Sequence, residues 1–163
     1  MNRPIMLPLS DFKKIIKLTP LISIDLIVRN LQGQILLGER LNKPAQGFWF
    51  VPGGRVLKDE TLEEAFQRLI KAELNSALIS SKFKGVYQHF YSDNVTGESF
   101  GTHYIVLAYE VILDCELDSL PTEQHSNYRW FAEEELLQDL HVHKHSKWYF
   151  QDEKEADNTF CKT

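Results

Sequence analysis

Residues 53–75 place the strongest constraint on the fold, because they read as a tight turn followed directly by an amphipathic helix. At Pro52-Gly53-Gly54 the backbone can approach a ligand closely, since no bulky Cβ substituents stand in the way. We predict a helix that runs to about Leu74, with Asp59 and Glu60 at its N-terminus, where negative charge is favoured. This turn and helix are the first candidates for a ligand site.

Glu73 decides how the end of this helix is interpreted. The predicted apolar stripe contains Leu62, Phe66 and Leu69. On a regular helix Glu73 lies roughly 20° in azimuth from Leu62, in line with that stripe. A carboxylate that faces the core costs free energy unless a cation meets it. The alternative is that the helix frays and Glu73 turns to water. Periodicity alone leaves both readings open.

The spacing of polar residues in this stretch resembles the box of the Nudix hydrolases, G-x5-E-x7-R-E-U-x-E-E-x-G-U, where U is a bulky aliphatic residue. Up to the final glycine of the pattern, five positions agree and three depart, since two carboxylates and that glycine are replaced. In that family the carboxylates hold divalent cations around a diphosphate, so the resemblance implies fewer metal ions here. The agreeing residues are Gly54, Glu60, Arg68, Ile70 and Glu73; the departures are Leu69, Ala72 and Asn75.

One branch of this family has a box with the same losses, the GDP-mannose mannosyl hydrolases. The resemblance to that branch covers the chain from Thr19-Pro20-Leu21 to Tyr128-Arg129-Trp130. It is carried by four stretches: 42–56 (NKPAQGFWFVPGGRV), 88–91 (QHFY), 102–104 (THY) and 123–125 (EQH). It implies a single α/β domain over residues 1–163, with the Nudix fold, an α/β/α sandwich around a mixed β-sheet.

The resemblance also implies a reaction, the hydrolysis of GDP-mannose, with GDP-glucose as a second candidate substrate, to GDP and free sugar. Water would attack the anomeric carbon with inversion. The metal ligands carried over from the branch are the carbonyl of Gly53 and the side chains of Glu73 and Gln124. Oxygen ligands of this kind suit Mg²⁺ or Mn²⁺, and one ion per active site is expected. Without the resemblance, Gln124 reads as an ordinary loop residue.

The same resemblance assigns roles to five further residues. His125 matches the general base, and an imidazole with a pKa near 6.5 accepts a proton from water at neutral pH. Arg40 and Arg55 match the arginines that bind the leaving group, because guanidinium groups fit phosphate oxygens and stay charged. Tyr104 matches a hydroxyl donor to the departing phosphate. Asp25 matches a carboxylate that supports positive charge on the sugar. Purely structural interpretations are also open for three of them. Arg40 could be a solvated residue at a strand end, Tyr104 an ordinary half-buried strand tyrosine, and Asp25 a buried carboxylate hydrogen-bonded to backbone.

Other polar residues are interpreted as structural. His141, His143 and His145 are spaced by two, which does not place them on one helical face, and we expect them to be solvated surface residues. His89 and His103 lie in strand patterns and read as core or pocket histidines. Arg68 is expected to pair with Glu64, four residues before it on the helix surface, and Glu60 is expected to be structural near the helix N-terminus.

Two rival functions are weighed against this reading. In the first, water attacks phosphorus and the products are GMP and mannose 1-phosphate; the loss of carboxylates at Leu69 and Ala72 argues against it. In the second, the protein is a Nudix-fold sensor that binds a nucleotide sugar without turning it over. Such a sensor would be expected to lose its base or its remaining metal ligand, yet Glu73, Gln124 and His125 are all present.

Composition narrows the possible partners. A net charge of −5 argues against a broad surface for nucleic acid. Two cysteines, Cys115 and Cys161, are too few for a disulfide framework or a metal site. The chain shows no basic leader followed by a long apolar run and no apolar stretch long enough to span a bilayer, so a cytoplasmic protein without membrane contact is expected. The resemblance implies a homodimer, in which Phe12 or the terminal segment could reach across the interface.

Alternating and periodic residues predict the remaining elements. Residues 114–126 are expected to form a polar loop and residues 38–50 a connection that brings Arg40 toward the box. Together the elements predict a mixed sheet with helices on its faces. The predicted strands are 21–28, 34–37, 83–91, 100–112 and 128–131, and the predicted helices besides the box helix are 10–18, a segment opening at Ala132-Glu133, and 145–150.

Overall fold

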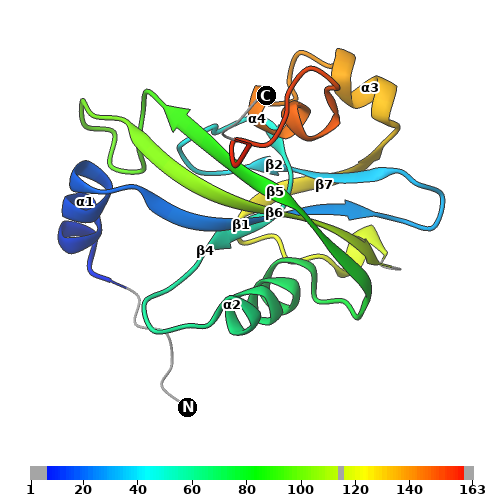
Figure 1. Cartoon of the computed structure of the whole chain (residues 1–163), viewed down its shortest axis with the longest axis horizontal. Coiled ribbons are helices and arrows are strands. Elements are labelled where there is room, and N and C mark those ends of the chain that lie inside the picture. Colours follow the sequence, from blue (N-terminus) through cyan, green and yellow to red (C-terminus); the bar gives the residue numbers. More distant parts are fainter. Residues whose placement is uncertain (1–6, 114–115, 160–163) are drawn as a thin grey trace.

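The computed structural model describes residues 7–113 and 116–159, and Figure 1 shows a twisted β-sheet with helices on both sides. Within these residues, seven strands form one sheet in the order β3-β2-β1-β6-β5, with β4 paired to β1 and β7 paired to β2. The strands are β1 (Leu21–Arg29), β2 (Ile35–Arg40), β3 (Trp49–Phe50), β4 (Gly53–Arg55), β5 (Leu78–Tyr91), β6 (Thr102–Leu113) and β7 (His125–Phe131). The helical elements are α1 (Leu9–Leu18), α2 (Leu62–Leu69), the π-helix η1 (Ile70–Leu74), the 3-10 helices η2 (Leu117–Ser119) and η3 (Trp148–Phe150), α3 (Glu133–Gln138) and α4 (Lys144–Lys147).

Strand β1 is the centre of the sheet. It runs parallel to β6 and antiparallel to β2 and β4, so the sheet is mixed. Every residue from 23 to 28 is buried, because layers of side chains cover both faces of this strand. The predicted alternation nevertheless sorts the side chains: Ile24, Leu26 and Val28 face one hydrophobic cluster, and Ile27 faces the other.

The two clusters correspond to the two helical layers, and this confirms the predicted α/β/α sandwich. Figure 1 shows α2 on one side of the sheet and α3 with α4 on the other. Phe66 and Leu69 of α2 pack into the first cluster, while Leu136 of α3 and Tyr149 of η3 pack into the second. Among residues 7–113 and 116–159, no helix is both long and apolar enough to cross a membrane.

Helix α2 begins later than the sequence suggested. Thr61 is its N-cap, and a capping box links Thr61 with Glu64, so the predicted start near Asp59 and Glu60 is wrong. Leu62 is 49% exposed and does not belong to the buried stripe. The predicted Arg68–Glu64 pair is also wrong, because the capping box engages Glu64. Arg68 instead binds Glu60 with two hydrogen bonds, of 2.5 and 2.9 Å, which ties the helix to the segment before it.

The helix continues through the π-helical turn η1, where it widens instead of fraying. Asn75 ends the turn in the left-handed region, with φ 44° and ψ 38°. Asparagine tolerates this conformation better than most residues other than glycine, which accounts for Asn75 at the position where the Nudix box has glycine. Glu73 lies in the turn and is only 8% exposed, so the reading in which it turns to water is wrong. A π-helical turn inside an α-helix is frequent at functional sites.

Most predicted elements are present, with shifted ends. Strand β2 extends to Arg40, β5 begins at Leu78, and β7 begins at His125 within the predicted loop. Cys115 and Cys161, on which the absence of a cysteine site was argued, lie outside the described residues.

The segment that follows α3 packs along the chain just before the glycine turn. Trp49 and Val142 form an isolated parallel bridge. The amide of Trp49 donates to the carbonyl of His141, and the amide of His143 donates to the carbonyl of Trp49. The buried amide of Val51 donates to Oγ of Ser146 at 3.0 Å. The chain near its C-terminal end is thereby fixed to residues 49–51, which lead directly into the turn.

Candidate active site

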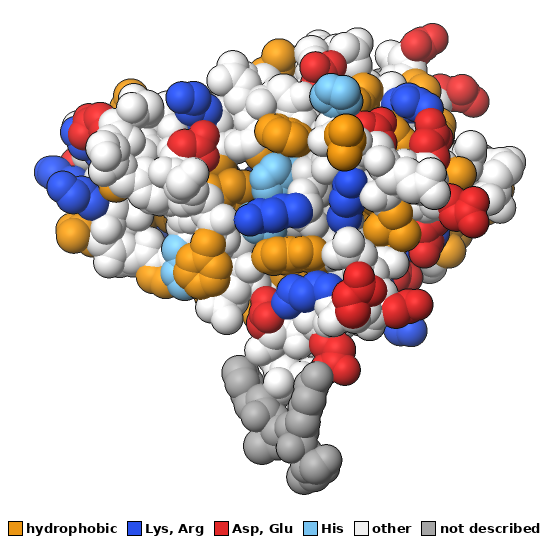
Figure 2. Space-filling view, turned by 90° about the horizontal axis from the view of Figure 1, so that it is seen from above, with side chains coloured by type: hydrophobic (Ala, Val, Ile, Leu, Met, Phe, Trp, Pro, Cys, Tyr) orange, Lys and Arg blue, Asp and Glu red, His pale blue; other side chains and the backbone are white. Residues whose placement is uncertain are grey.

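A cleft of about 260 Å³ opens where β1, β4, β6 and the π-helical turn meet. It brings together residues from distant parts of the sequence, because the sheet places the middle of β1 beside β4 and β6. Seven of the eight predicted site residues line it: Asp25, Arg40, Gly53, Arg55, Glu73, Tyr104 and Gln124. Figure 2 shows that Lys and Arg side chains gather in the middle of one face of the molecule, with histidine and hydrophobic side chains beside them.

Glu73 has the properties expected of a carboxylate that binds a cation. It is 8% exposed, and the described residues provide its carboxylate with no hydrogen bond. Burial raises its pKa to about 7, while the positive charges of Arg40 and Arg68 act in the opposite direction. A buried anion with so little compensation is costly on its own.

The residues that line the cleft include oxygen donors of the kind that a small divalent cation prefers. Within residues 7–113 and 116–159, no group of three or more His, Cys, Asp or Glu side chains is arranged to hold a metal. A site here would therefore depend on one carboxylate, from Glu73, together with the backbone carbonyl of Gly53 and the amide oxygen of Gln124, all on the wall of the cleft. Such an oxygen donor set suits Mg²⁺ or Mn²⁺, with positions left for water or phosphate oxygens.

Two arginines provide fixed positive charge in the cleft. Arg40 ends β2 and lies over the ring of Phe50, with 5.7 Å from Cζ to the ring centroid. Its charge lowers the pKa values of Asp25 and Glu73 against the effect of burial. Arg55 ends β4 and lies 3.9 Å above the ring of Phe12 in α1. Both guanidinium groups are partly buried, so their interaction with an anionic ligand is less screened than at an open surface.

Asp25 is the second buried carboxylate of the cleft. It is 7% exposed, and burial raises its pKa to about 7, opposed by a hydrogen bond from Tyr149 and by the charge of Arg40. The predicted alternative, a hydrogen bond to backbone, is wrong, because the bond to the Asp25 carboxylate comes from a side chain: the Tyr149 hydroxyl donates to Oδ2 at 2.6 Å. Tyr104 lies on the neighbouring strand β6, and burial raises the pKa of its hydroxyl, which keeps it protonated as a donor.

His125 differs from the other predicted residues, because it does not line the cleft. It is 3% exposed and faces Gly38 on the adjacent strand β2. A Cβ atom at Gly38 would lie only 2.5 Å from Cγ of His125, so the imidazole fits here because that residue is glycine. Burial, followed by the charge of Arg40, lowers the pKa of His125 to about 4. The neighbouring Gln124 is exposed and does line the cleft.

Hydrogen bonds around His125 favour one tautomer. The hydroxyl of Tyr128 donates to the carbonyl of Pro121 at 2.6 Å, which uses its single proton. The contact of 3.3 Å between this hydroxyl and Nδ1 of His125 then requires Nδ1 to be the donor. Nε2 is left with a lone pair, and it is buried without a hydrogen-bond partner. The imidazole is therefore neutral, with its free lone pair on Nε2.

The prediction for the C-terminal histidines is wrong for two of three. His141 is exposed, as expected, but His145 is 1% exposed and His143 is half-buried. His145 stacks on His89, with ring centroids 4.2 Å apart and an interplanar angle of 13°. The reason is that this segment packs against β3 instead of projecting into water. His89 is itself 2% exposed and lines the cleft, in agreement with its reading as a core or pocket residue.

These buried groups predict the pH dependence of stability. Four histidines have pKa values lowered by burial, so between about pH 4.5 and 6.5 the unfolded chain binds protons that the folded chain does not, and stability rises with pH. Asp25 and Glu73, with pKa values raised to about 7, act in the opposite direction over the same range. Four groups outweigh two, so we expect the urea midpoint of the metal-free protein to fall when the pH is lowered from 6.5 to 5. A midpoint that rises on acidification would contradict the burial of the histidines, His89, His125, His143 and His145.

Comparisons with known proteins were made for the whole chain. The sequence profile of the NUDIX domain matches residues 19–151. The low-salt glycan biosynthesis protein Agl8 of Haloferax volcanii is 38% identical over 125 residues, which is 77% of this chain and 79% of that protein.

Solved structures show the same fold. The MutT NUDIX hydrolase from Burkholderia pseudomallei superimposes with a TM-score of 0.64 at 27% identity, over 81% of this chain and 96% of that chain. The MutT protein from Methanosarcina mazei Go1 superimposes with a TM-score of 0.65 at 23% identity, over 80% of this chain and 91% of that chain.

Proposed function

The chain belongs to the Nudix hydrolase family, and from this premise we propose that it hydrolyses the nucleotide sugar GDP-mannose, or GDP-glucose in the same site, to GDP and free sugar. The reaction would occur by attack of water at the anomeric carbon, with inversion. The name of the Haloferax relative concerns glycan biosynthesis, a process that consumes activated sugars, and this supports a nucleotide sugar as substrate. The homodimer and the cytoplasmic location implied by the sequence resemblance belong to the same proposal.

The observation that carries this proposal is the distribution of carboxylates around the cleft. Leu69 is 2% exposed and stands in the wall, where the Nudix box has a carboxylate, so only Glu73 of the helix is available to a metal. Attack at phosphorus calls for more neutralisation of charge on the phosphate than attack at carbon does, so a single carboxylate on the helix favours attack at carbon. The remaining carboxylate, Asp25, lies across the cleft on β1 beside Gly53. There it is suited to stabilise positive charge on a sugar.

The chain's own residues would divide the work of binding and leaving-group stabilisation. Arg40 and Arg55 bind the diphosphate oxygens with their guanidinium forks, and Tyr104 donates a hydrogen bond to the departing phosphate. A divalent cation held by Gly53, Glu73 and Gln124 would neutralise part of the diphosphate charge. All of these groups line one cleft, which supports a joint role in binding a diphosphate there.

His125 would accept the proton of the attacking water at Nε2. Because its ring lies behind Gly38, we propose that residues 121–124, which form neither helix nor strand, shift together with the first residue of β7, His125, when substrate binds and so bring Nε2 to the cleft. Gln124 joins this segment to the histidine and would move with it. The neutral tautomer fixed by Tyr128 would keep Nε2 unprotonated until the reaction.

The products test the proposal directly. The protein is incubated with GDP-mannose and Mg²⁺, and phosphorus and anomeric proton NMR are followed together. We expect GDP and β-mannose as the first products, since inversion at the α-linked carbon gives the β anomer. GMP with mannose 1-phosphate would show attack at phosphorus and overturn the mechanism, and binding without turnover would favour a sensor.

A further inference from the structure

We propose that Tyr149, near the C-terminal end of the chain, is a positioning residue that fixes the Asp25 carboxylate for catalysis. This inference rests on the proposed role of Asp25 at the sugar. It adds a residue from outside the Nudix box, 124 positions away from Asp25 in the sequence. No periodicity or spacing in the sequence connects the two.

The contact between the two side chains is short and fully enclosed. The Tyr149 hydroxyl donates to Oδ2 of Asp25 at 2.6 Å, and the residues are 3% and 7% exposed. Oδ1 lies on the other side of the carboxylate, where a Cβ atom at Gly53 would come within 3.1 Å of it. With one oxygen bound to Tyr149 and the other beside the glycine turn, the carboxylate has little freedom to rotate.

A second hydrogen bond orients the hydroxyl. The Tyr149 oxygen lies 3.3 Å from Nε2 of His89. Since the hydroxyl proton is directed to Asp25, the oxygen accepts from Nε2–H of His89, which selects that tautomer of the ring. The stacked ring of His145 covers His89 at 4.2 Å. The resulting chain, from His89 through Tyr149 to Asp25, lets the tyrosine donate in one direction only.

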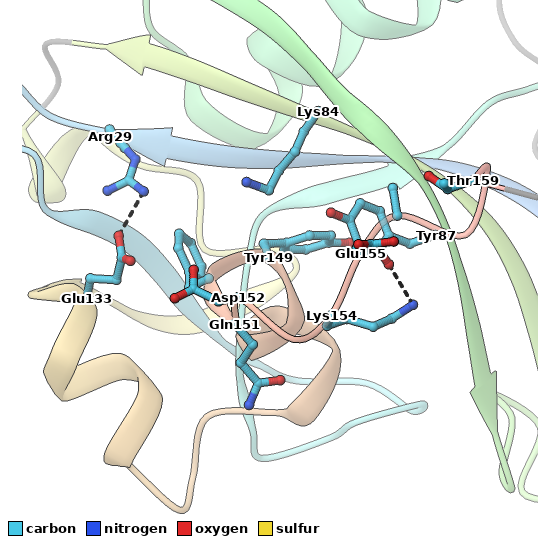
Figure 3. Close-up of a pocket in the computed structure, with 12 residues that line it drawn as sticks. Arg29, Lys84, Tyr87, Glu133, Tyr149, Gln151, Asp152, Lys154, Glu155 and Thr159 are labelled. Atoms are coloured by element: carbon cyan, nitrogen blue, oxygen red, sulfur yellow. Dashed lines mark hydrogen bonds and ion pairs between the residues drawn. The ribbon is translucent and has the colours of Figure 1, made fainter. Parts of the chain in front are cut away.

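The position of Tyr149 is set by packing on the far side of the sheet from α2. Its ring meets the ring of Tyr87 edge-on, with centroids 4.9 Å apart. Both rings line a second cavity, of about 450 Å³, and Figure 3 shows Tyr149 and Tyr87 on its wall. The bond between Val51 and Ser146 fixes the segment that carries Tyr149. The ring is thus held at the wall of the second cavity, while the hydroxyl reaches Asp25, which lines the cleft of the candidate active site.

Tyr149→Phe removes the hydroxyl and keeps the ring. A hydrogen bond to a charged group contributes about 1.5–3 kcal/mol, so we expect kcat to fall roughly 10- to 100-fold, with KM changed by less than about threefold. In an Asp25→Ala background the same substitution should cause little further loss, because the hydroxyl then has no carboxylate to position. Tyr87→Phe is the matched control, since it removes a hydroxyl from the adjacent buried ring that does not contact Asp25, and it should retain wild-type kcat.

Two kinetic results would overturn the inference: losses in kcat that multiply in the double variant, or equal effects of Tyr149→Phe and Tyr87→Phe. The wild type, Tyr149→Phe, Asp25→Ala and the double variant are also compared by urea unfolding without metal or substrate. Non-additive changes in the unfolding midpoint are expected if the two side chains interact. Additive midpoints would also overturn it. The unfolding cycle needs no turnover, so a failure of the proposed reaction, seen in the wild-type products, is distinguishable from a failure of the Tyr149–Asp25 contact.

Discussion

His125→Gln is expected to lower kcat by roughly 10²–10⁴-fold, the range that general base catalysis contributes. Glutamine is similar in size and keeps polar atoms near Tyr128, but its amide does not accept a proton at neutral pH. Binding of GDP should change little, because His125 does not line the cleft that holds Arg40 and Arg55. Steady-state kinetics with GDP-mannose, together with calorimetric binding of GDP, would measure both effects.

His141→Gln provides the matched control for this substitution. His141 is exposed and lies outside the cleft, so the same chemical change there should leave kcat and GDP binding at wild-type values. Turnover of His125→Gln within about twofold of the wild type would rule out the base, since a general base contributes far more than this.

The substitution Glu73→Gln should distinguish the effect of the buried carboxylate on stability from its role in binding the metal. At pH 8 the ionised carboxylate is unfavourable in the metal-free protein, because burial raises its pKa from 4.5 to about 7. This shift corresponds to a destabilisation of the folded state by roughly 3 kcal/mol, which is absent below about pH 4.5 and fully present above about pH 7. We therefore expect Glu73→Gln to be more stable than the wild type at pH 8 in the absence of metal, by up to that amount. In the presence of Mg²⁺, the variant should have lost most of the activity of the wild type.

Added Mg²⁺ should reverse this order. A ligand that binds only the folded state stabilises it by about 2.7 kcal/mol at a hundred times its Kd, so the wild type should gain stability while Glu73→Gln gains little. Urea unfolding with and without Mg²⁺ measures both proteins. Glu63→Gln is the control, because Glu63 is exposed on the same helix and should respond to Mg²⁺ as the wild type does. An equal response of Glu73→Gln would mean that the carboxylate does not bind the cation.

The sequence was sufficient for the features that depend on local pattern. Alternation along β1 and the periodicity of α2 predicted both elements, and the glycine turn and Glu73 came together in one cleft as the Nudix box implied. The regular helical period placed Glu73 toward the core, although Leu62, from which that direction was measured, is exposed. The start of α2 was misjudged because a capping box, and not the acidic residues, defines it.

Features that depend on distant contacts could not be predicted. The interval of two between His143 and His145 carries no signal for burial, because their positions follow from the pairing of this segment with β3. Tyr149 was missed for the same reason. Its one available signal was the run Trp148-Tyr149-Phe150, since three consecutive aromatic residues in a polar stretch indicate packing against something. Only the folded sheet shows that the neighbour of Tyr149 is Asp25.

The bond between Asp25 and Tyr149 has a consequence for how the enzyme is made. Residue 25 leaves the ribosome early and residue 149 near the end of synthesis. The cleft therefore remains incomplete after most of the chain has emerged from the ribosome. The parallel pairing of β1 with β6 adds another contact between distant residues, and such contacts form slowly. A nascent chain that has emerged only as far as β7 carries every residue of the Nudix box, yet it lacks the tyrosine that fixes Asp25. Activity should therefore arise as one of the last events of folding, after release of the whole chain.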